Sequence, residues 1–371
     1  MKILFFSDLV PTENNCHLFK GDSFATICGD ELFSSMREAS LNVINLECPL
    51  YDGVQKIDKC GPILVAPREC INALSSIPHP LFLLANNHIL DCGEEGLKST
   101  ISSLDEKGIP HIGAGLDKAE ASKPYHFGDD VILNICEHEF SINETGATAN
   151  AFVEHEICSV ISSFKNEGKK VIVIYHGGRE YYPYPTPRLY ERCHKMVDCG
   201  AALVLVEHIH IVGEMEKYRQ GTIVYGLGNF VFNLDVKSDS WKRGIAVEYD
   251  DVTAETLIIP TIQDHGKVRL AKGIELKEII DGFNARSEQI KDSSSITSNY
   301  QKEREAAIIK FLCKLGGYSR LRMGIEVIIF KGFFVKRRYS KKKLLCILNI
   351  MECESHNEIL ISGIKDLIAN K

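Results

Sequence analysis

The chain has 371 residues, a formal net charge of −7 and 44% hydrophobic residues. This composition is typical of a globular protein and excludes a disordered or collagen-like chain. The thirteen cysteines are odd in number, scattered and without a CxxC pair, so we expect reduced thiols and no disulfide framework.

The N-terminus, MKILFFSDLV, carries only a short apolar run before Asp8, which fits neither a secretion signal nor a membrane span. No later stretch reaches the ~18 to 20 uninterrupted apolar residues that a span needs. We therefore expect a cytoplasmic protein, with peripheral contact at the inner face of the membrane as an additional option for its C-terminal part.

Short apolar runs rich in Ile, Val and Leu recur through the first 230 residues and are typical of buried strands. They cover residues 2–6, 42–46, 81–85, 131–135, 171–175, 202–206 and 222–225. Helical patterns lie between some of them, at residues 97–104 and 188–199. This alternation of strand and helix predicts an α/β sandwich that contains parallel strands.

The character of the chain changes after about Leu276, so we expect one domain over residues 1–275 and a mainly helical region over residues 276–371. Residues 292–299 (DSSSITSN) read as a polar linker or loop. Residues 314–343 hold ten Lys or Arg against the single acid Glu326, with an apolar cluster inside the basic stretch. This stretch is either a peripheral contact for anionic membrane or capsule machinery, or a packed appendage with a solvated basic face.

Nucleic acid is disfavoured as a partner. The net charge is negative, and the basic surplus lies far in sequence from the polar residues described next.

Metal-capable side chains follow five of the predicted strands. Open α/β sheets place their sites at the carboxyl ends of strands, so these side chains are expected to meet at one edge. They are Asp8, Asn45 with Glu47, Asn87 with His88, His176, and His208 with His210. Mixed oxygen and nitrogen donors suit Mn, Fe or Zn better than Ca or Mg. The spacing of the last two histidines sends both imidazoles to the same side of an extended backbone.

Together these motifs resemble the CapA-type proteins of poly-gamma-glutamate capsule synthesis, a branch of the calcineurin-like metallophosphoesterase superfamily. The resemblance covers roughly residues 1–235. The matching pieces are NLECPL at residues 45–50, ANNHILDCG at 85–93, GAG at 113–115, HGGREY at 176–181, the HIH of 208–210 and YGLGNF at 225–230.

The resemblance implies a four-layer α-β-β-α sandwich with a dinuclear site of two divalent transition-metal ions (Mn, Fe or Zn). The ligands implied by motif position are Asp8, Glu47, Asn87, His176, His208 and His210, with Glu47 at the bridging position. His88 is similar to the histidine that protonates the leaving oxygen in the superfamily. The chain departs from the family pattern at Val10, Glu207 and Ile209, where the family or superfamily has His, His and Pro.

We therefore expect a metal-dependent hydrolase, most simply of a phosphoester, that uses metal-activated water in capsule or cell-surface polymer metabolism. Two alternatives stay open: an enzyme acting on an amide or glutamyl polymer, and a non-catalytic accessory protein of capsule assembly. An anionic small molecule or polymer precursor is the expected substrate. The expected substrate-binding residues are Asn45, Lys59, Arg179 and Glu180.

Asp91 has two readings: it either orients the imidazole of His88, as a catalytic residue, or caps the helix that begins near Gly93.

Overall fold

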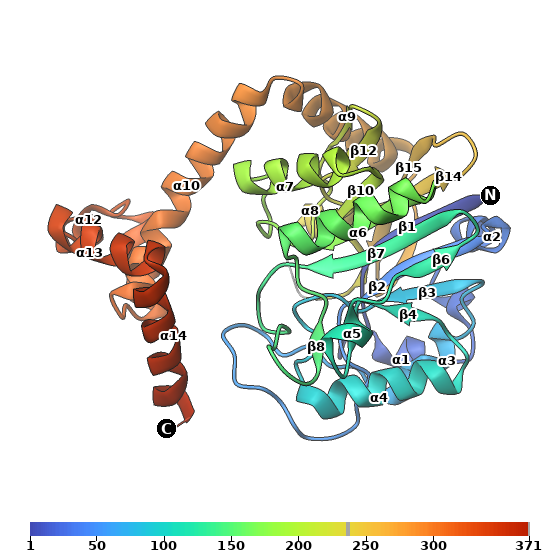
Figure 1. Ribbon diagram of the computed structural model, residues 1–371, viewed down its shortest axis with the longest axis horizontal. Coiled ribbons are helices and arrows are strands. Elements are labelled where there is room, and N and C mark those ends of the chain that lie inside the picture. The colour runs from blue at the N-terminus through green and yellow to red at the C-terminus, as the bar shows by residue number, and fades with distance from the viewer. Residues whose placement is uncertain (235–237, 370–371) are drawn as a thin grey trace. The chain divides into compact units, whose positions relative to one another are not determined.

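The computed structural model describes residues 1–234 and 238–369. It divides into two compact units, Met1–Thr297 and Ser298–Lys371. The first unit contains all the strands of the described residues (Figure 1). Its last full helix, α9 (Gly273–Ile290), belongs to it because Ile279 and Phe283 are buried in its core. The boundary between the two compact units therefore lies after α9.

Two β-sheets form the centre of the first unit. The order of the first sheet is β16-β15-β14-β1-β2-β3-β4, and β13 pairs with the C-terminal part of β1. Its strands are β1 (Lys2–Val10), β2 (Leu41–Leu46), β3 (Pro80–Leu83), β4 (His111–Ile112), β13 (Asn229–Phe232), β14 (Arg243–Asp250), β15 (Thr256–Asp264) and β16 (Lys267–Leu270). Strands β1 to β4 run parallel, whereas β14 to β16 are antiparallel.

The second sheet has the order β11-β12-β10-β9-β7-β6. Its strands are β6 (Tyr125–Phe127), β7 (Asp130–Cys136), β9 (Lys170–His176), β10 (Ala201–Glu207), β11 (Met215–Tyr218) and β12 (Gly221–Val224). The central strands β7, β9, β10 and β12 are parallel. A small ladder joins β5 (Ala114–Gly115) and β8 (Thr148–Ala149).

Alternation of side chains along the strands separates the layers. In β1, Ile3 and Phe5 face a core shared with the second sheet, whereas Leu4 and Phe6 face a core shared with helices. The helices on the outer face of the first sheet are α1 (Cys16–Phe19), α2 (Asp30–Glu38), α3 (Ile71–Leu74) and α4 (Gly93–Glu106). Those covering the second sheet are α6 (Glu154–Asn166) and α7 (Pro187–Asp198). The predicted four-layer α-β-β-α sandwich is confirmed (Figure 1).

Four further short elements lie in the connections of the first unit. They are α5 (Lys118–Ala121), α8 (Asp239–Lys242) and the short 3-10 turns Phe24–Thr26 and Arg68–Cys70. All seven predicted strands and both predicted helices are present within a few residues of their expected ends. The thirteen cysteines are all free.

Residues 293–299 form the start of α10 (Ser293–Leu315), so the prediction of a loop was wrong, although the boundary between the two compact units falls inside this stretch, after Thr297. The reason is local: Asp292 accepts hydrogen bonds from the backbone N–H and the hydroxyl of Ser294, as a residue before a helix does. Ile296 is buried in the core beside the second sheet. The serines of this stretch therefore serve as the first turn of a helix.

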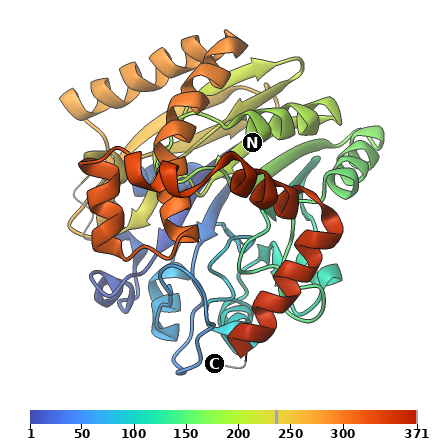
Figure 2. The same ribbon diagram turned by 90° about the vertical axis from the view of Figure 1, so that its left-hand side faces the viewer.

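The second unit is helical, as expected (Figure 2). It contains the rest of α10 and the helices α11 (Arg320–Ile328), α12 (Phe333–Arg338), α13 (Lys341–Glu352) and α14 (Glu354–Ala369). Its core is small and consists of Ile309, Leu312, Cys313 and Val335. Among the described residues, no helix combines the length and the apolar character needed to cross a lipid bilayer.

Candidate metal centre

The carboxyl ends of the parallel strands bring polar side chains from both sheets together. Asp8 lies near the end of β1, Asn45 and Glu47 lie at the end of β2, and His176 is the last residue of β9. The amide nitrogen of Asn45 lies 2.7 Å from Asp8 Oδ1 and 3.2 Å from Nδ1 of His176. Asn45 therefore joins the two sheets at this edge, between two predicted ligands.

Three donor atoms crowd one side of the cluster. Nε2 of His176 lies 3.1 Å from the amide oxygen of Asn87 and 3.1 Å from Nδ1 of His208. A pair of imidazole nitrogens shares at most one proton, so lone pairs of these groups face the same small space. This is the arrangement that a cation in that space would satisfy.

Asp8 and His210 form the other side of the cluster. Nδ1 of His210 lies 3.1 Å from Asp8 Oδ2 and 3.0 Å from the amide oxygen of Asn229. Burial raises the pKa of Asp8, but the hydrogen bond with His210 and the charges of His210 and His176 outweigh it, so the net pKa is lowered. Asp8 is therefore a carboxylate at neutral pH.

Glu47 lies between these two sides and is fully buried. Among the described residues, neither of its carboxylate oxygens has a hydrogen-bond partner; Nε2 of His176 is 3.4 Å from Oε1 without the geometry of a bond. A buried carboxylate without hydrogen-bond partners is costly, and proteins keep such groups chiefly where a cation or substrate completes them. The donor set thus fits a metal centre.

Glu47 is common to two groups of three side chains whose donor atoms lie within 4.8 Å of one another. The first group adds His176 and His208, and the second adds Asp8 and His210. The two groups together contain five of the six predicted ligands, and Asn87 joins the first through His176. Glu47 therefore occupies the position from which one carboxylate can serve two ions.

Two of these histidines hold unusual backbone conformations. His208 has φ of 83° and His210 has φ of 60°, in the left-handed region that non-glycine residues rarely adopt. Such conformations cost free energy and are found where the surrounding structure fixes a functional side chain. The turn after β10 thus directs both rings of the HIH motif into the cluster.

Carboxylates and burial compete to set protonation within the cluster. Burial disfavours the charged ring of His176, but Glu207 and Glu47 outweigh it and raise its pKa to about 10. Burial likewise opposes the charge on His210, yet Glu47 and Asp8 raise the pKa of His210 to about 9. For His208, burial and the adjacent histidines lower the pKa well below its usual value. Protons therefore compete with cations for this cluster.

A second constellation lies beside the cluster, in the segment after β3. His88 directly follows Asn87, and its Nδ1 lies 2.7 Å from Oδ2 of Asp91. Lys59 forms an ion pair with the other oxygen of Asp91 and lies 3.0 Å from Nδ1 of His88. The side chains of Lys59 and Asp91 are buried. Asp91 does not cap α4: the cap position is Cys92, without a side-chain bond.

Several members of the cluster were not predicted. Glu207, the last residue of β10, forms a third metal-capable group with Asp8 and His176. Glu137, just after β7, has Oε1 3.7 Å from Nε2 of His208. Asn229, the first residue of β13, contacts His210. Glu207 and Asn229 could have been found from their positions next to the HIH motif and within YGLGNF, whereas a lone acid after β7 gave no signal.

The remaining predicted residues lie near the cluster. Arg179 and Glu180 follow His176 in the loop that leads to α7, and both are partly buried. The charge of Glu180 contributes to the raised pKa of His210. Tyr181, in the same loop, has its ring 5.9 Å from that of His210 and stacks on Trp241.

Residues 3–234 match the family model described as bacterial capsule synthesis protein PGA_cap. The chain belongs to this family. The resemblance predicted from the motifs is thereby confirmed, and the four layers agree with the metallophosphoesterase-like fold of PGA_cap proteins.

The chain is similar to three curated relatives over about half of its length. It is 28% identical over 224 residues to capsule biosynthesis protein CapA of Bacillus anthracis, covering 56% of this chain and 53% of that protein. It is 28% identical over 174 residues to the PGA biosynthesis protein CapA of Bacillus subtilis, covering 45% and 46%. A probable polyglutamine synthesis accessory protein of Mycobacterium tuberculosis is 26% identical over 207 residues, covering 51% and 54%. The chain spans about half the length of these relatives.

Proposed function

We propose that this chain is a metal-dependent hydrolase of a phosphoester in capsule or cell-surface polymer metabolism. The observation that carries the proposal is the carboxylate of Glu47, buried without a hydrogen-bond partner and shared by two groups of metal-capable side chains. The adjacent pair of His88 and Asp91 supplies what a scaffold would not need, a positioned acid beside the cluster.

The residues that would hold two divalent ions are Asp8, Glu47, Asn87, His176, His208 and His210. Such ions lower the pKa of water and offset the negative charge of phosphoryl oxygens. The buried carboxylates Asp8 and Glu47 favour cations at this edge of the sheets, and Asn45 holds Asp8 in place through its 2.7 Å hydrogen bond.

His88 would protonate the leaving oxygen. Its Nδ1 is engaged by Asp91, which fixes the orientation of the ring. Nε2 has no hydrogen-bond partner among the described residues, so it is the atom that would carry the transferred proton. Lys59 neutralises Asp91 and lies over the ring of Phe140 at 4.7 Å, which holds the whole group in place.

The test is a screen of the purified chain against phosphodiesters and phosphomonoesters with added Mn. Turnover that disappears in a His208→Ala variant would support the proposal. Two bound ions per chain without turnover on any phosphoester would favour the alternative that the relatives' names suggest, action on an amide or glutamyl polymer.

A second candidate function, recruitment of capsule machinery or membrane without catalysis, is favoured by the surface of the second unit. Apolar side chains there are largely exposed, among them Ile328 at 76% and Ile329 at 65%. Phe330, Phe333 and Phe334 are also exposed and lie within the basic stretch of residues 314–343. Exposed aromatic and basic side chains together suit an anionic lipid surface.

A further inference from the structure

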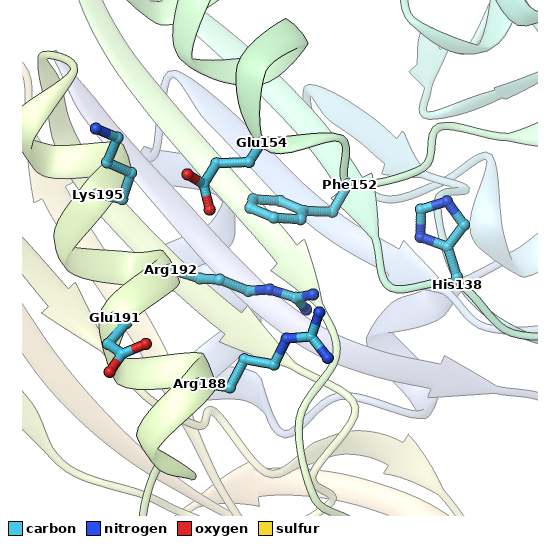
Figure 3. Close-up of a pocket in the computed structure, with 7 residues that line it drawn as sticks. All are labelled: His138, Phe152, Glu154, Arg188, Glu191, Arg192 and Lys195. Atoms are coloured by element: carbon cyan, nitrogen blue, oxygen red, sulfur yellow. The ribbon is translucent and has the colours of Figure 1, made fainter. Parts of the chain in front are cut away.

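A cavity of about 560 Å³ lies beside α7, between that helix and the segment that leads into α6 (Figure 3). A second cavity of about 510 Å³ adjoins it, because His138, Arg188 and Arg192 line both. The second cavity is also lined by Glu137 and Arg179. Neither of the two arginines shared by the cavities was singled out by the sequence.

Arg188 and Arg192 lie one turn apart on α7, and their guanidinium groups point to the same side, toward His138 (Figure 3). Arg192 is fixed in place: it donates a 2.8 Å hydrogen bond to the hydroxyl of Tyr175 and lies 4.7 Å from the ring of Phe152. Within the described chain, neither arginine forms an ion pair with a carboxylate. Like charges at this spacing repel each other, so an anion bound between the two guanidinium groups would relieve the repulsion.

The position of Arg188 adds to this attraction. Helix α7 begins at Pro187, and Thr186 caps it by accepting a 3.2 Å hydrogen bond from the backbone N–H of Leu189. Arg188 therefore sits in the first turn, where the helix dipole favours negative charge nearby. Glu191, on the same helix, points away from the two guanidinium groups (Figure 3).

Glu137 connects the arginine pair to the metal centre. It lines the second cavity, and its Oε1 lies 3.7 Å from Nε2 of His208. Glu137 therefore lies on the path from the arginines to this predicted metal ligand. Because Glu137 and Glu154 are acids, an anionic group would lie at the arginine end of this path.

We propose that Arg188 and Arg192 bind a second anionic group, a carboxylate or phosphate, of the substrate whose reacting group lies at the metal centre. The proposal rests on the proposed function for the reacting group. It narrows the substrate class to molecules that carry two oxyanions joined by a short chain. Simple monoesters with a neutral remainder would use only the metal centre.

The test uses calorimetry on the full chain with Mn and a non-hydrolysable pair of probes, butane-1,4-bisphosphonate and butylphosphonate, with spacers of three to six methylenes as a series. At the best spacer, the bisphosphonate should bind about tenfold tighter, because one additional charge-assisted contact is gained. Equal binding of the two probes at every spacer would overturn the proposal.

Arg188→Gln should reduce this preference to less than about threefold, and Arg188→Lys should fall between it and the parent chain, since lysine keeps the charge but not the fork. Lys195→Gln is the matched control: the same helix, the same cavity and the same loss of charge, but a side chain directed away from the arginines (Figure 3). An equal loss in the control would assign the effect to net charge and overturn the proposal.

Inorganic phosphate distinguishes the two sources of the anion. If Arg188→Gln weakens phosphate binding while the bisphosphonate has no advantage, the cavity serves a free oxyanion, and the substrate proposal is wrong. Phosphonate binding needs no turnover, so this inference and the hydrolase proposal can fail independently in the same preparation.

Discussion

Nδ1 of His88 lies 2.7 Å from Oδ2 of Asp91, within a buried segment that directly follows the predicted metal ligand Asn87. The second oxygen of Asp91 is paired with Lys59. The imidazole is thus fixed at one nitrogen and available at the other. A ligand set alone would bind metal, whereas the proposed hydrolase also needs a proton donor, the role that we propose for His88.

His88→Ala should retain bound metal and lose turnover by about a hundredfold to ten-thousandfold, the usual contribution of a general acid. The loss should be largest for esters with alkoxide leaving groups and small for p-nitrophenyl esters, whose leaving group needs no proton. The measurement is kcat on both ester types together with metal content. Unchanged turnover of an alkyl ester would contradict the role of His88.

Glu47→Gln should change the melting temperature in opposite directions in metal-free and metal-loaded protein. In chelator-treated protein at about pH 10, where His176 and His210 are losing the protons whose charge pairs with Glu47, the variant should melt higher, because a buried carboxylate without a hydrogen-bond partner is removed; about 1 kcal/mol corresponds to about 2–4 °C. With metal it should melt lower than the parent, because the ligand that contributes to binding is lost. Thermal unfolding with and without Mn measures both.

Glu214→Gln is the control for this experiment. Glu214 is also buried with two oxygens that lack hydrogen-bond partners, but it belongs to none of the metal-capable groups among the described residues. Its replacement should raise the melting temperature equally with and without metal. If Glu47→Gln behaved like this control, the assignment of Glu47 to the metal centre would be wrong.

Asp130 should make stability depend on pH. Burial raises its pKa to about 6, with Asp251 and Asp129 adding to the effect and Lys170 opposing it. A carboxyl whose pKa is higher folded than unfolded binds more protons in the native state, so its unfavourable contribution is absent below about pH 4 and complete above about pH 6.

Asp130→Asn should therefore raise the melting temperature by about 2 °C or more at pH 8 and leave it almost unchanged at pH 4. Asp129→Asn, at the exposed neighbouring position, should leave the melting temperature almost unchanged at both pH values, since the side chain of Asp129 is 93% exposed. A gain for Asp130→Asn that is equal at the two pH values would show that its charge is not the cause.

The basic surface of the second unit should bind anionic vesicles. Replacing Lys341, Lys342 and Lys343 with Gln should reduce co-sedimentation with phosphatidylserine vesicles about tenfold or more, at about 1 kcal/mol per charge. The matched control is the triple replacement of Lys107, Lys123 and Lys267, which are exposed on the first unit. Co-sedimentation that is unchanged by the first triple variant would exclude this surface as a membrane contact.

Much of the candidate centre was predictable because apolar runs in the sequence show where the buried strands end. Asp8, Glu47 and His176 each follow an apolar run, and parallel strands bring such positions to one edge. The same reasoning would have predicted Glu207, at the end of β10, as a member of the centre. It would not have predicted Glu137, because the place of Glu137 near His208 depends on the path of the loop after β7.

The helical part of the chain was harder to read. Residues 292–299 have the composition of a loop, and only the hydrogen bonds of Asp292 and the burial of Ile296 make them helical. The arginine pair on α7 was missed for a related reason. Spacing places Arg188 and Arg192 on one face, but the absence of ion pairs for either in the described chain is a property of the packed structure.

The most direct test of the central claim is metal content by elemental analysis of the full chain purified without chelator and loaded with Mn, Fe or Zn. We expect about two ions per chain for the parent and for His88→Ala, and a clear loss for His208→Ala. No bound metal in the parent chain under any loading would contradict the metal centre and the hydrolase built on it.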